Sequence, residues 1–150
     1  SELMSRVEHA GIASAFRCLG TLPYADLATL MRGSVALVNP SLFEGWSTTV
    51  EEAKSLGKRI VLSNLPVHRE QAPVRGVFFD PRNPEELADK LWDVWSSFDL
   101  AEEARAQDAS ESALPSRQAA FAKAYEKIAL EVVGAPRPRV DHGQAGASSA

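Results

Sequence analysis

Cysteine is nearly absent from this sequence of 150 residues, in which Cys18 is the single thiol. One cysteine excludes a disulfide or a cysteine-based metal site within one chain. Because Cys18 lies in the apolar run Phe16–Leu19, we expect a small buried side chain. No apolar run approaches the roughly 18 residues of a transmembrane segment, and the first residues do not resemble a secretory signal. We expect a cytoplasmic protein, or one held peripherally at the inner face of a membrane.

Positive charge is also scarce, with 16 Lys and Arg against 20 Asp and Glu and a net charge of −4 at pH 7. A mildly acidic chain is a poor candidate for binding along a nucleic-acid backbone, so we expect no nucleic-acid partner. A local anion site made of backbone amides remains open, since it needs no net positive charge. The histidines, cysteine and carboxylates show no cluster with metal-ligand spacing, and no metal site is expected.

Hydrophobic residues make up 45% of the chain and charged residues 24%, which is ordinary for a protein with a folded core. Short apolar runs predict strands at 16–19, 35–38, 59–62 and 77–79. Apolar residues at helical spacing predict helices at 1–10, 24–31, 49–56, 84–95, 101–112 and 115–133, with a single turn at 66–71. This alternation predicts an α/β fold, a Rossmann-like parallel sheet with helices on both faces and a helical C-terminal end.

The same pattern predicts the domain organisation. Residues 1–133 form one domain, whereas residues 134–150 are rich in Pro, Gly, Ala and Ser without periodicity, which is typical of a disordered tail. The first residues resemble the interior and end of a helix. The opening strands of a doubly wound sheet, where a first phosphate loop would lie, have no counterpart. We therefore expect an N-terminally truncated piece of a longer protein.

The loop after strand 35–38 carries the candidate site. In open α/β sheets, ligands bind beyond the carboxyl ends of the strands, and this loop leads directly into the helix at 49–56. Residues 45–49 would present successive backbone N–H groups at the positive end of that helix dipole, which suits a phosphate or diphosphate. The alternative is that Ser47 or Thr48 simply caps the helix.

Two neighbouring glutamates near the start of that helix have different interpretations. Thr48 and Glu51 have the spacing of a capping box, so a structural role is available to Glu51. Glu52 lies about 100° further round the helix and could accept two hydroxyl groups at once, as acidic residues do with ribose in dinucleotide folds. A solvated carboxylate is the alternative for Glu52. Glu44 would lie about one helical turn from Glu52 if the loop is compact, or else be an ordinary loop carboxylate.

Three further side chains are expected outside the site. His68, which follows strand 59–62, is expected at the surface or at a helix cap, with a position facing the site as the alternative. Trp92 and Trp95 are expected in the core rather than as platforms for a ligand.

The segment NPSLFEGWSTTVEEAKSLGKRIVLSN, residues 39–64, resembles the signature of the group 1 (family four) retaining glycosyltransferases, which have the GT-B fold. In that family a Pro-Ser-x-x-Glu-Gly loop leads into a helix, and a second glutamate completes the E-x7-E motif. The matching positions are Pro40, Ser41, Glu44, Gly45, Glu52, Ala53 and Gly57. The resemblance extends from about Ala10 to Trp95 and, more loosely, to the last helix.

The resemblance implies that residues 1–133 are the C-terminal, nucleotide-sugar-binding domain of such an enzyme. Glu52 would hold the ribose hydroxyls of the donor, and Glu44 would face the donor sugar as the catalytic candidate. The residues that would cradle the diphosphate or the sugar are Gly45, Trp46, Ser47, Thr48 and Thr49. The family's usual loop is Glu-Gly-Phe-Gly-Leu-Pro, so Trp-Ser-Thr-Thr alters these contacts. The basic residues that neutralise the diphosphate in the family have no counterpart in this chain and would lie upstream.

The function that the resemblance implies is sugar transfer from a nucleotide diphosphate donor, such as a UDP- or GDP-sugar, to a glycan or lipid-linked acceptor. The reaction would retain the anomeric configuration and serve polysaccharide biosynthesis. Catalysis would be mainly electrostatic, and no cofactor is expected. Because the N-terminal acceptor-binding domain would be missing, this chain alone is expected to be inactive. The alternatives are a non-catalytic nucleotide-sugar-binding module, a sugar-nucleotide epimerase of the same fold and a purely structural domain.

Overall fold

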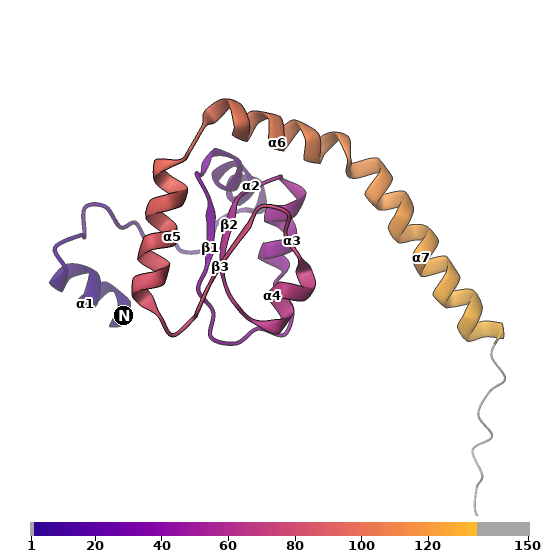
Figure 1. Cartoon of the computed structure of the whole chain (residues 1–150), viewed down its shortest axis with the longest axis horizontal. Coiled ribbons are helices and arrows are strands. Elements are labelled where there is room, and N and C mark those ends of the chain that lie inside the picture. Colours follow the sequence, from indigo (N-terminus) through magenta and orange to yellow (C-terminus); the bar gives the residue numbers. More distant parts are fainter. Residues whose placement is uncertain (1, 135–150) are drawn as a thin grey trace, which may run out of the picture. The chain divides into compact units, whose positions relative to one another are not determined.

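The computed structural model describes residues 2–134 of the chain. These residues fall into two units, the first ending at Glu111 and the second beginning at Ser112. The first unit carries the sheet, and the second contains the long helix α7 (Leu114–Gly134). Figure 1 shows the elements coloured along the chain. The disordered tail predicted at 134–150 lies outside the described residues, apart from Gly134, which ends α7.

Three parallel strands form the sheet, in the order β1-β2-β3. The strands are β1 (Leu37–Asn39), β2 (Ile60–Ser63) and β3 (Gly76–Phe79). In register, Leu37 lies opposite Ile60, and Ile60 lies opposite Gly76. The helices before α7 are α1 (Glu2–His9), α2 (Tyr24–Gly33), α3 (Thr48–Ser55), α4 (Pro66–Gln71), α5 (Pro84–Ser96) and α6 (Leu100–Ser112). The predicted α/β architecture with a parallel sheet is therefore confirmed.

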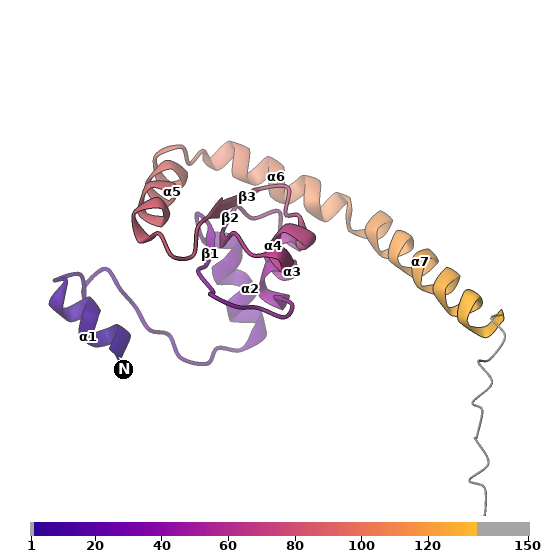
Figure 2. The ribbon, with the colours of Figure 1, turned by 60° about the horizontal axis from the view of Figure 1, so that its bottom comes forward.

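Helices cover both faces of the sheet, with α3 and α4 on one side and α5 on the other (Figures 1 and 2). Successive side chains of β2 point to opposite faces, as in any strand. The core on the α3 side consists of Val50, Ala53, Ile60 and Leu62. The core on the α5 side consists of Val61, Phe79 and Val94. Because every residue of β2 is buried, its sequence is an apolar run without alternation.

The strand predicted at residues 16–19 is absent, and the structure gives this segment no regular secondary structure. Cys18 is exposed, so the prediction of a buried thiol is also wrong. A strand needs a hydrogen-bonded neighbour, and none of the described strands pairs with this segment. Among the described strands β1 pairs with β2 alone, and its Val38 is exposed. A continuous apolar run such as 35–38 predicts a strand buried on both faces of a parallel sheet, and for β1 that prediction is wrong.

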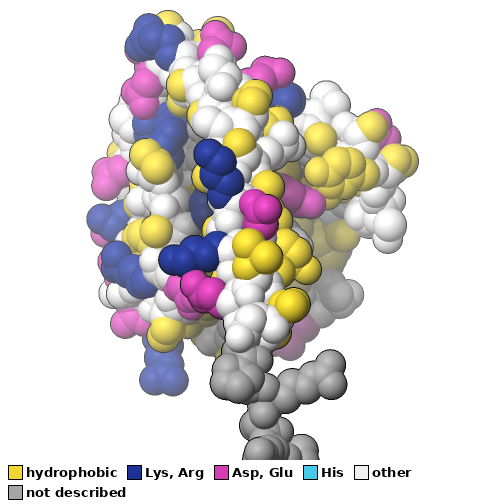
Figure 3. All heavy atoms as spheres, turned by 90° about the vertical axis from the view of Figure 1, so that its right-hand side faces the viewer, with side chains coloured by type: hydrophobic (Ala, Val, Ile, Leu, Met, Phe, Trp, Pro, Cys, Tyr) yellow, Lys and Arg dark blue, Asp and Glu magenta, His cyan; other side chains and the backbone are white. Residues whose placement is uncertain are grey.

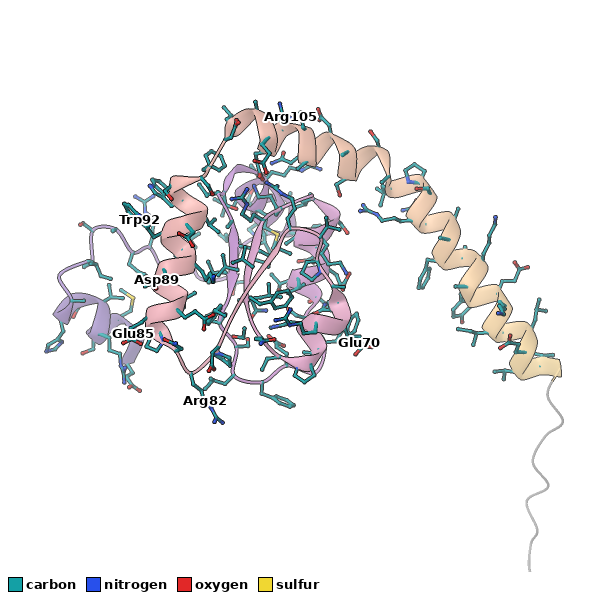
Figure 4. All side chains as sticks on the ribbon, in the orientation of Figure 1. Glu70, Arg82, Glu85, Asp89, Trp92 and Arg105 are labelled. Atoms are coloured by element: carbon teal, nitrogen blue, oxygen red, sulfur yellow. The ribbon has the colours of Figure 1, made fainter. Side chains whose placement is uncertain are left out.

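The two tryptophans of α5 also differ from prediction. Trp92 and Trp95, expected in the core, are 69% and 66% exposed. The buried position on this helix is Val94, which packs on the sheet. Figure 4 shows Trp92 on the side of α5 that also carries Glu85 and Asp89, away from the sheet. Apolar spacing predicted the helix correctly but not which of its large side chains face the core.

A buried ammonium group joins α6 to the amino ends of the strands. Lys58, two residues before β2, is buried. Its Nζ donates to the carbonyl oxygens of Arg32, at 3.2 Å, and Ser34, and to the carboxylate of Glu103 on α6. A buried charge is stable only when its hydrogen bonds and a countercharge are supplied, and these partners supply both. The end of α2, the approach to β2 and α6 are thereby held together.

The partner carboxylate, Glu103, is buried and accepts a second cation. Arg75 donates to Glu103 Oε2 and to the carbonyl oxygen of Gly57, both at 2.7 Å. Gly57 has φ of 67°, and a Cβ there would lie 2.4 Å from the carbonyl oxygen of Ala106, so glycine is required for α6 to approach this closely. Burial raises the pKa of Glu103, but the hydrogen bonds from Lys58 and Arg75 outweigh burial and hold it below its ordinary value.

In the second unit, the predicted final helix forms as α7, and none of its described residues is buried. Four large apolar side chains at helical spacing, which predict an apolar face for this helix, are all exposed: Phe121, Tyr125, Ile128 and Val132. The rings of the first two stack with their centroids 6.4 Å apart. Figure 3 shows hydrophobic side chains at the surface among basic and acidic ones.

The substitution Glu103→Gln is expected to lower the free energy of unfolding by about 3 kcal/mol at pH 7, because it leaves the buried Lys58 ammonium without its countercharge. The folded pKa of Glu103 lies below the unfolded one. Its stabilising contribution is therefore complete above the unfolded pKa and disappears as pH falls through the folded pKa. Urea unfolding should show the difference between wild type and variant shrinking below about pH 4.

The neighbouring residue Glu102 provides a matched control. Its carboxylate lies 3.2 Å from both Arg59 and Arg75, but the side chain is 49% exposed. Glu102→Gln should therefore cost no more than about 1 kcal/mol. Equal losses from the two variants would contradict the conclusion that the buried pair of Lys58 and Glu103 holds α6.

Candidate functional site

The loop between β1 and α3 lies at the carboxyl end of the sheet, where open α/β sheets bind their ligands. Asn39, the last residue of β1, organises this loop. Its Oδ1 accepts from the backbone N–H of Ser41 at 3.3 Å and lies 2.7 Å from the Ser41 hydroxyl. Its Nδ2 donates to the hydroxyl of Ser47, at the other end of the loop, at 3.1 Å. One side chain therefore holds both ends of the loop.

Glu44 lies within this loop and is half-buried. The Ser41 hydroxyl lies 2.8 Å from its Oε1, so the carboxylate is held against the loop. The sequence interpretation included Ser41 in the motif but missed Asn39. The available signal was an Asn-Pro pair directly after a strand, because asparagine side chains in turns bond the backbone two residues on.

Helix α3 does not begin with the predicted capping box. Ser47 is the N-cap residue, and its side chain makes no capping bond because its hydroxyl accepts from Asn39 in the interior. Thr48 is already the first residue of the helix, so the capping-box prediction for Thr48 and Glu51 is wrong. Among the residues predicted to cradle a diphosphate, Ser47 is buried and Thr49 half-buried, whereas the others are exposed: Gly45, Trp46 and Thr48.

The two neighbouring glutamates of α3 have different surroundings. Glu51 Oε1 accepts from Gln71 Nε2 on α4 at 2.9 Å and from Lys54 Nζ at 3.0 Å. Glu52 is half-buried, and both glutamates line a pocket between α2 and α3. Adjacent helical residues differ by about 100°, and the hydrogen bonds to Gln71 and Lys54 distinguish Glu51 from its neighbour. Glu51 thus has a structural role, although not the one expected for it.

The pocket has a volume of about 230 Å³. It is lined from α2 by Tyr24, Leu27, Ala28 and Met31 and from α3 by Glu51, Glu52, Ser55 and Leu56. Mainly apolar walls with a few polar groups are typical of a small-molecule site. The carbonyl of Arg32, near the end of α2, accepts from Lys58. The buried ammonium therefore also fixes the helix that forms one wall of the pocket.

Helix α4 brings two further polar side chains into the interior. His68 is fully buried, so its predicted position at the surface or at a cap is wrong. Its Nδ1 lies 2.8 Å from the carbonyl oxygen of Ser63, so this nitrogen carries the proton. Gln71, one turn further on, donates to the backbone of Ser47 and to Glu51. The start of α3 is therefore held from α4 as well as from β1.

Residues 1–110 match the model of the family described as glycosyl transferases group 1. This chain belongs to the group 1 glycosyltransferases. No curated protein matches it significantly. The matched residues include the loop, α3 and the pocket, so the site described above lies within the group 1 glycosyltransferase domain. Membership confirms the coarser part of the resemblance, a transferase that moves a sugar between a donor and an acceptor.

Within residues 2–134 this glycosyltransferase domain has no helix long and apolar enough to cross a membrane. The same residues bring together no group of three or more His, Cys, Asp or Glu side chains that could hold a metal ion. The groups that the site offers to a ligand are backbone amides, hydroxyls and carboxylates around the start of α3.

Replacement of Asn39 by alanine is expected to lower the free energy of unfolding by about 1–2 kcal/mol, since it leaves the buried Ser47 hydroxyl without its donor. Asn64 follows β2 as closely and accepts from Arg69 at 2.7 Å, but it is exposed. Asn64→Ala should therefore cost less than about 0.5 kcal/mol. Chemical denaturation of both variants gives the comparison. Similar losses would show that Asn39 does not organise the loop.

Proposed function

We propose that this chain is the donor-binding half of a retaining glycosyltransferase with the GT-B fold. The complete enzyme transfers a sugar from a nucleoside diphosphate donor to a glycan or lipid-linked acceptor in polysaccharide biosynthesis. The observation that carries the proposal is the pocket between α2 and α3, which Glu52 lines beside the start of α3. Family membership supports the same reading.

The pocket suits the nucleoside part of the donor. Its apolar lining offers a surface for a base, and Glu52 offers acceptors for the two ribose hydroxyls. Its volume of about 230 Å³ is below the roughly 300 Å³ or more that encloses a drug-sized ligand. The pocket would therefore enclose the nucleoside alone, and the diphosphate and the sugar would lie outside it, over the loop.

The diphosphate would bind at the amino end of α3. The first N–H groups of a helix have no intrahelical acceptor and lie at the positive end of its dipole. The exposed Gly45, Trp46 and Thr48 leave this backbone accessible. The exposed Thr48 hydroxyl is a further donor, whereas the Ser47 hydroxyl is buried, where it accepts from Asn39. Half-buried Thr49 would contribute through its backbone.

Glu44 would face the donor sugar from the loop, held there by Ser41. In the transfer, the bond between the anomeric carbon and the diphosphate oxygen breaks. The acceptor oxygen bonds to the same face of that carbon and gives up its proton to the departing diphosphate oxygen. Negative charge develops on the departing diphosphate, and prearranged amides at α3 would stabilise it. No protein nucleophile and no cofactor are required in this proposal.

The proposal needs two further parts of the enzyme, an acceptor-binding domain and basic residues that neutralise the diphosphate. Without them this chain would be inactive by itself. A place in the cytoplasm, at or near the inner face of a membrane, would give such an enzyme access to lipid-linked acceptors.

Substitution of Glu52 by glutamine is expected to weaken the binding of UDP or GDP by about tenfold, because a neutral amide accepts ribose hydroxyls less well than a carboxylate. Calorimetric titration of the chain gives both affinities. With 2′,3′-dideoxy nucleotides the wild type and the variant should bind equally, since the hydroxyls are missing. The exposed Glu70 supplies the control, and Glu70→Gln should leave every affinity unchanged. A wild type that binds neither nucleotide, or a variant that loses no affinity, would contradict the proposal.

Glu44→Gln is expected to weaken the binding of the donor sugar without weakening the binding of the nucleotide. Because Glu44 would contact only the donor sugar, the variant should bind UDP- or GDP-sugars about fivefold more weakly than wild type. Its affinity for the corresponding nucleoside diphosphates should stay within about twofold. Equal losses of affinity for both kinds of ligand, measured by the same titrations, would show that Glu44 does not act on the donor sugar alone.

A further inference from the structure

We propose that Gln71 is a positioning residue whose amide holds the peptide group at the start of α3 in the orientation that binds the donor diphosphate. The inference rests on the proposed function, in which backbone N–H groups of this segment face the diphosphate. Gln71 ends α4 and lies outside the E-x7-E segment, residues 39–64. Its contacts with that segment are what single it out.

The Gln71 amide is fixed by the two hydrogen bonds that its nitrogen donates. Nε2 donates to the carbonyl oxygen of Ser47 at 2.8 Å and to Oε1 of Glu51 at 2.9 Å. Because both partners are acceptors, the nitrogen and not the oxygen of the amide must face them. The side chain is 3% exposed, and a hydrogen bond shielded from water is stronger than one at the surface. Its Oε1 is buried without a partner among the described residues, so these two bonds set its position.

The bond to the Ser47 carbonyl also orients the N–H of the next residue. A peptide group is planar and its C=O and N–H point in opposite directions, so an oxygen held toward α4 turns the Thr48 N–H away from α4. That N–H lies at the first position of α3 and has no intrahelical acceptor. The bond that the Ser47 carbonyl accepts from the Glu51 N–H is longer, at 3.3 Å. Gln71 is therefore the stronger restraint on this peptide.

The second hydrogen bond of Gln71 holds the negatively charged carboxylate of Glu51 in place. Glu51 lies in the first turn of α3, where a free carboxylate would repel a diphosphate at the helix start. Lys54 Nζ lies 3.0 Å from this carboxylate and also donates to the backbone carbonyl of Gln71. The three residues form a closed ring of contacts. The ring keeps the charge of Glu51 paired and directed toward α4, which lowers the repulsion.

The test compares wild type with Gln71→Met, which keeps the length of the side chain and removes the donor. The chain is titrated calorimetrically with UDP, GDP and the two parent nucleosides. Affinity for the diphosphate that binds should fall about fivefold to tenfold. Affinity for its nucleoside should change less than about twofold, because Gln71 does not line the pocket and Glu51, which does, keeps its bond to Lys54. Glu70→Met is the matched control on the outer side of α4 and should change neither affinity (Figure 4).

The outcomes separate the inference from the proposed function. Equal losses for diphosphate and nucleoside would indicate a merely structural role for Gln71 and overturn the inference, as would an unchanged affinity for the diphosphate. A wild type that binds neither nucleotides nor nucleosides would instead overturn the proposed function on which the inference rests.

A second pair of variants decides the matter if Gln71→Met does not fold. Gln71→Glu keeps the shape of the side chain but turns oxygen toward the Ser47 carbonyl and Glu51, so diphosphate affinity should fall at least as far. Adding Glu51→Gln restores one N–H···O bond between the two side chains, so the double variant should bind the diphosphate at least about twofold more tightly than the separate effects of the two single variants predict. A double variant without this gain in diphosphate affinity would contradict a role for the direct contact between residues 71 and 51.

Discussion

The first unit depends on one buried positive charge. The ammonium of Lys58 is out of water, and it is stable because two backbone carbonyls and the Glu103 carboxylate surround it. Since those carbonyls belong to Arg32 and Ser34, the same charge fixes the end of α2 and the approach to β1. Helix α2 forms one wall of the pocket that Glu52 lines. A contact at the amino ends of the strands therefore also fixes the end of a helix that lines the pocket.

Elements with local signals of their own could be predicted from the sequence. Asn83 caps α5 by accepting from the Glu86 N–H at 3.0 Å, and the apolar runs at 59–62 and 77–79 became strands. The failures share another cause. Whether the run at 16–19 joins a sheet, or Trp92 faces a core, depends on a partner elsewhere in the fold, and apolarity alone does not supply that partner. Local periodicity therefore predicted whether a segment forms a helix or a strand better than it predicted which side chains are buried.

In the candidate site, too, the features with a local sequence signal were predicted and those without one were missed. The E-x7-E resemblance located the loop and separated Glu52 from Glu51, because a motif and a helical offset are local. Asn39 and Gln71 were missed, since their roles come from hydrogen bonds to Ser47 across eight and 24 positions of the chain. Most polar groups that position a ligand are of this kind. They are satisfied by other parts of the protein, and no short stretch of sequence contains both partners.

Ser47 ties the loop between β1 and α3 to two other parts of the fold. Ser47 gives Asn39 a hydroxyl to bond, so the loop is tied down from β1 as well as from α4. Such fixing matters because the dipole of α3 supplies only about 0.3–2 kcal/mol to a bound anion. Micromolar binding of a nucleotide requires about 8 kcal/mol. In the proposed function, most of that would come from burying the nucleoside between α2 and α3. Preorganised amides at α3 would then contribute mainly where charge develops during transfer, since they need no rearrangement at that moment.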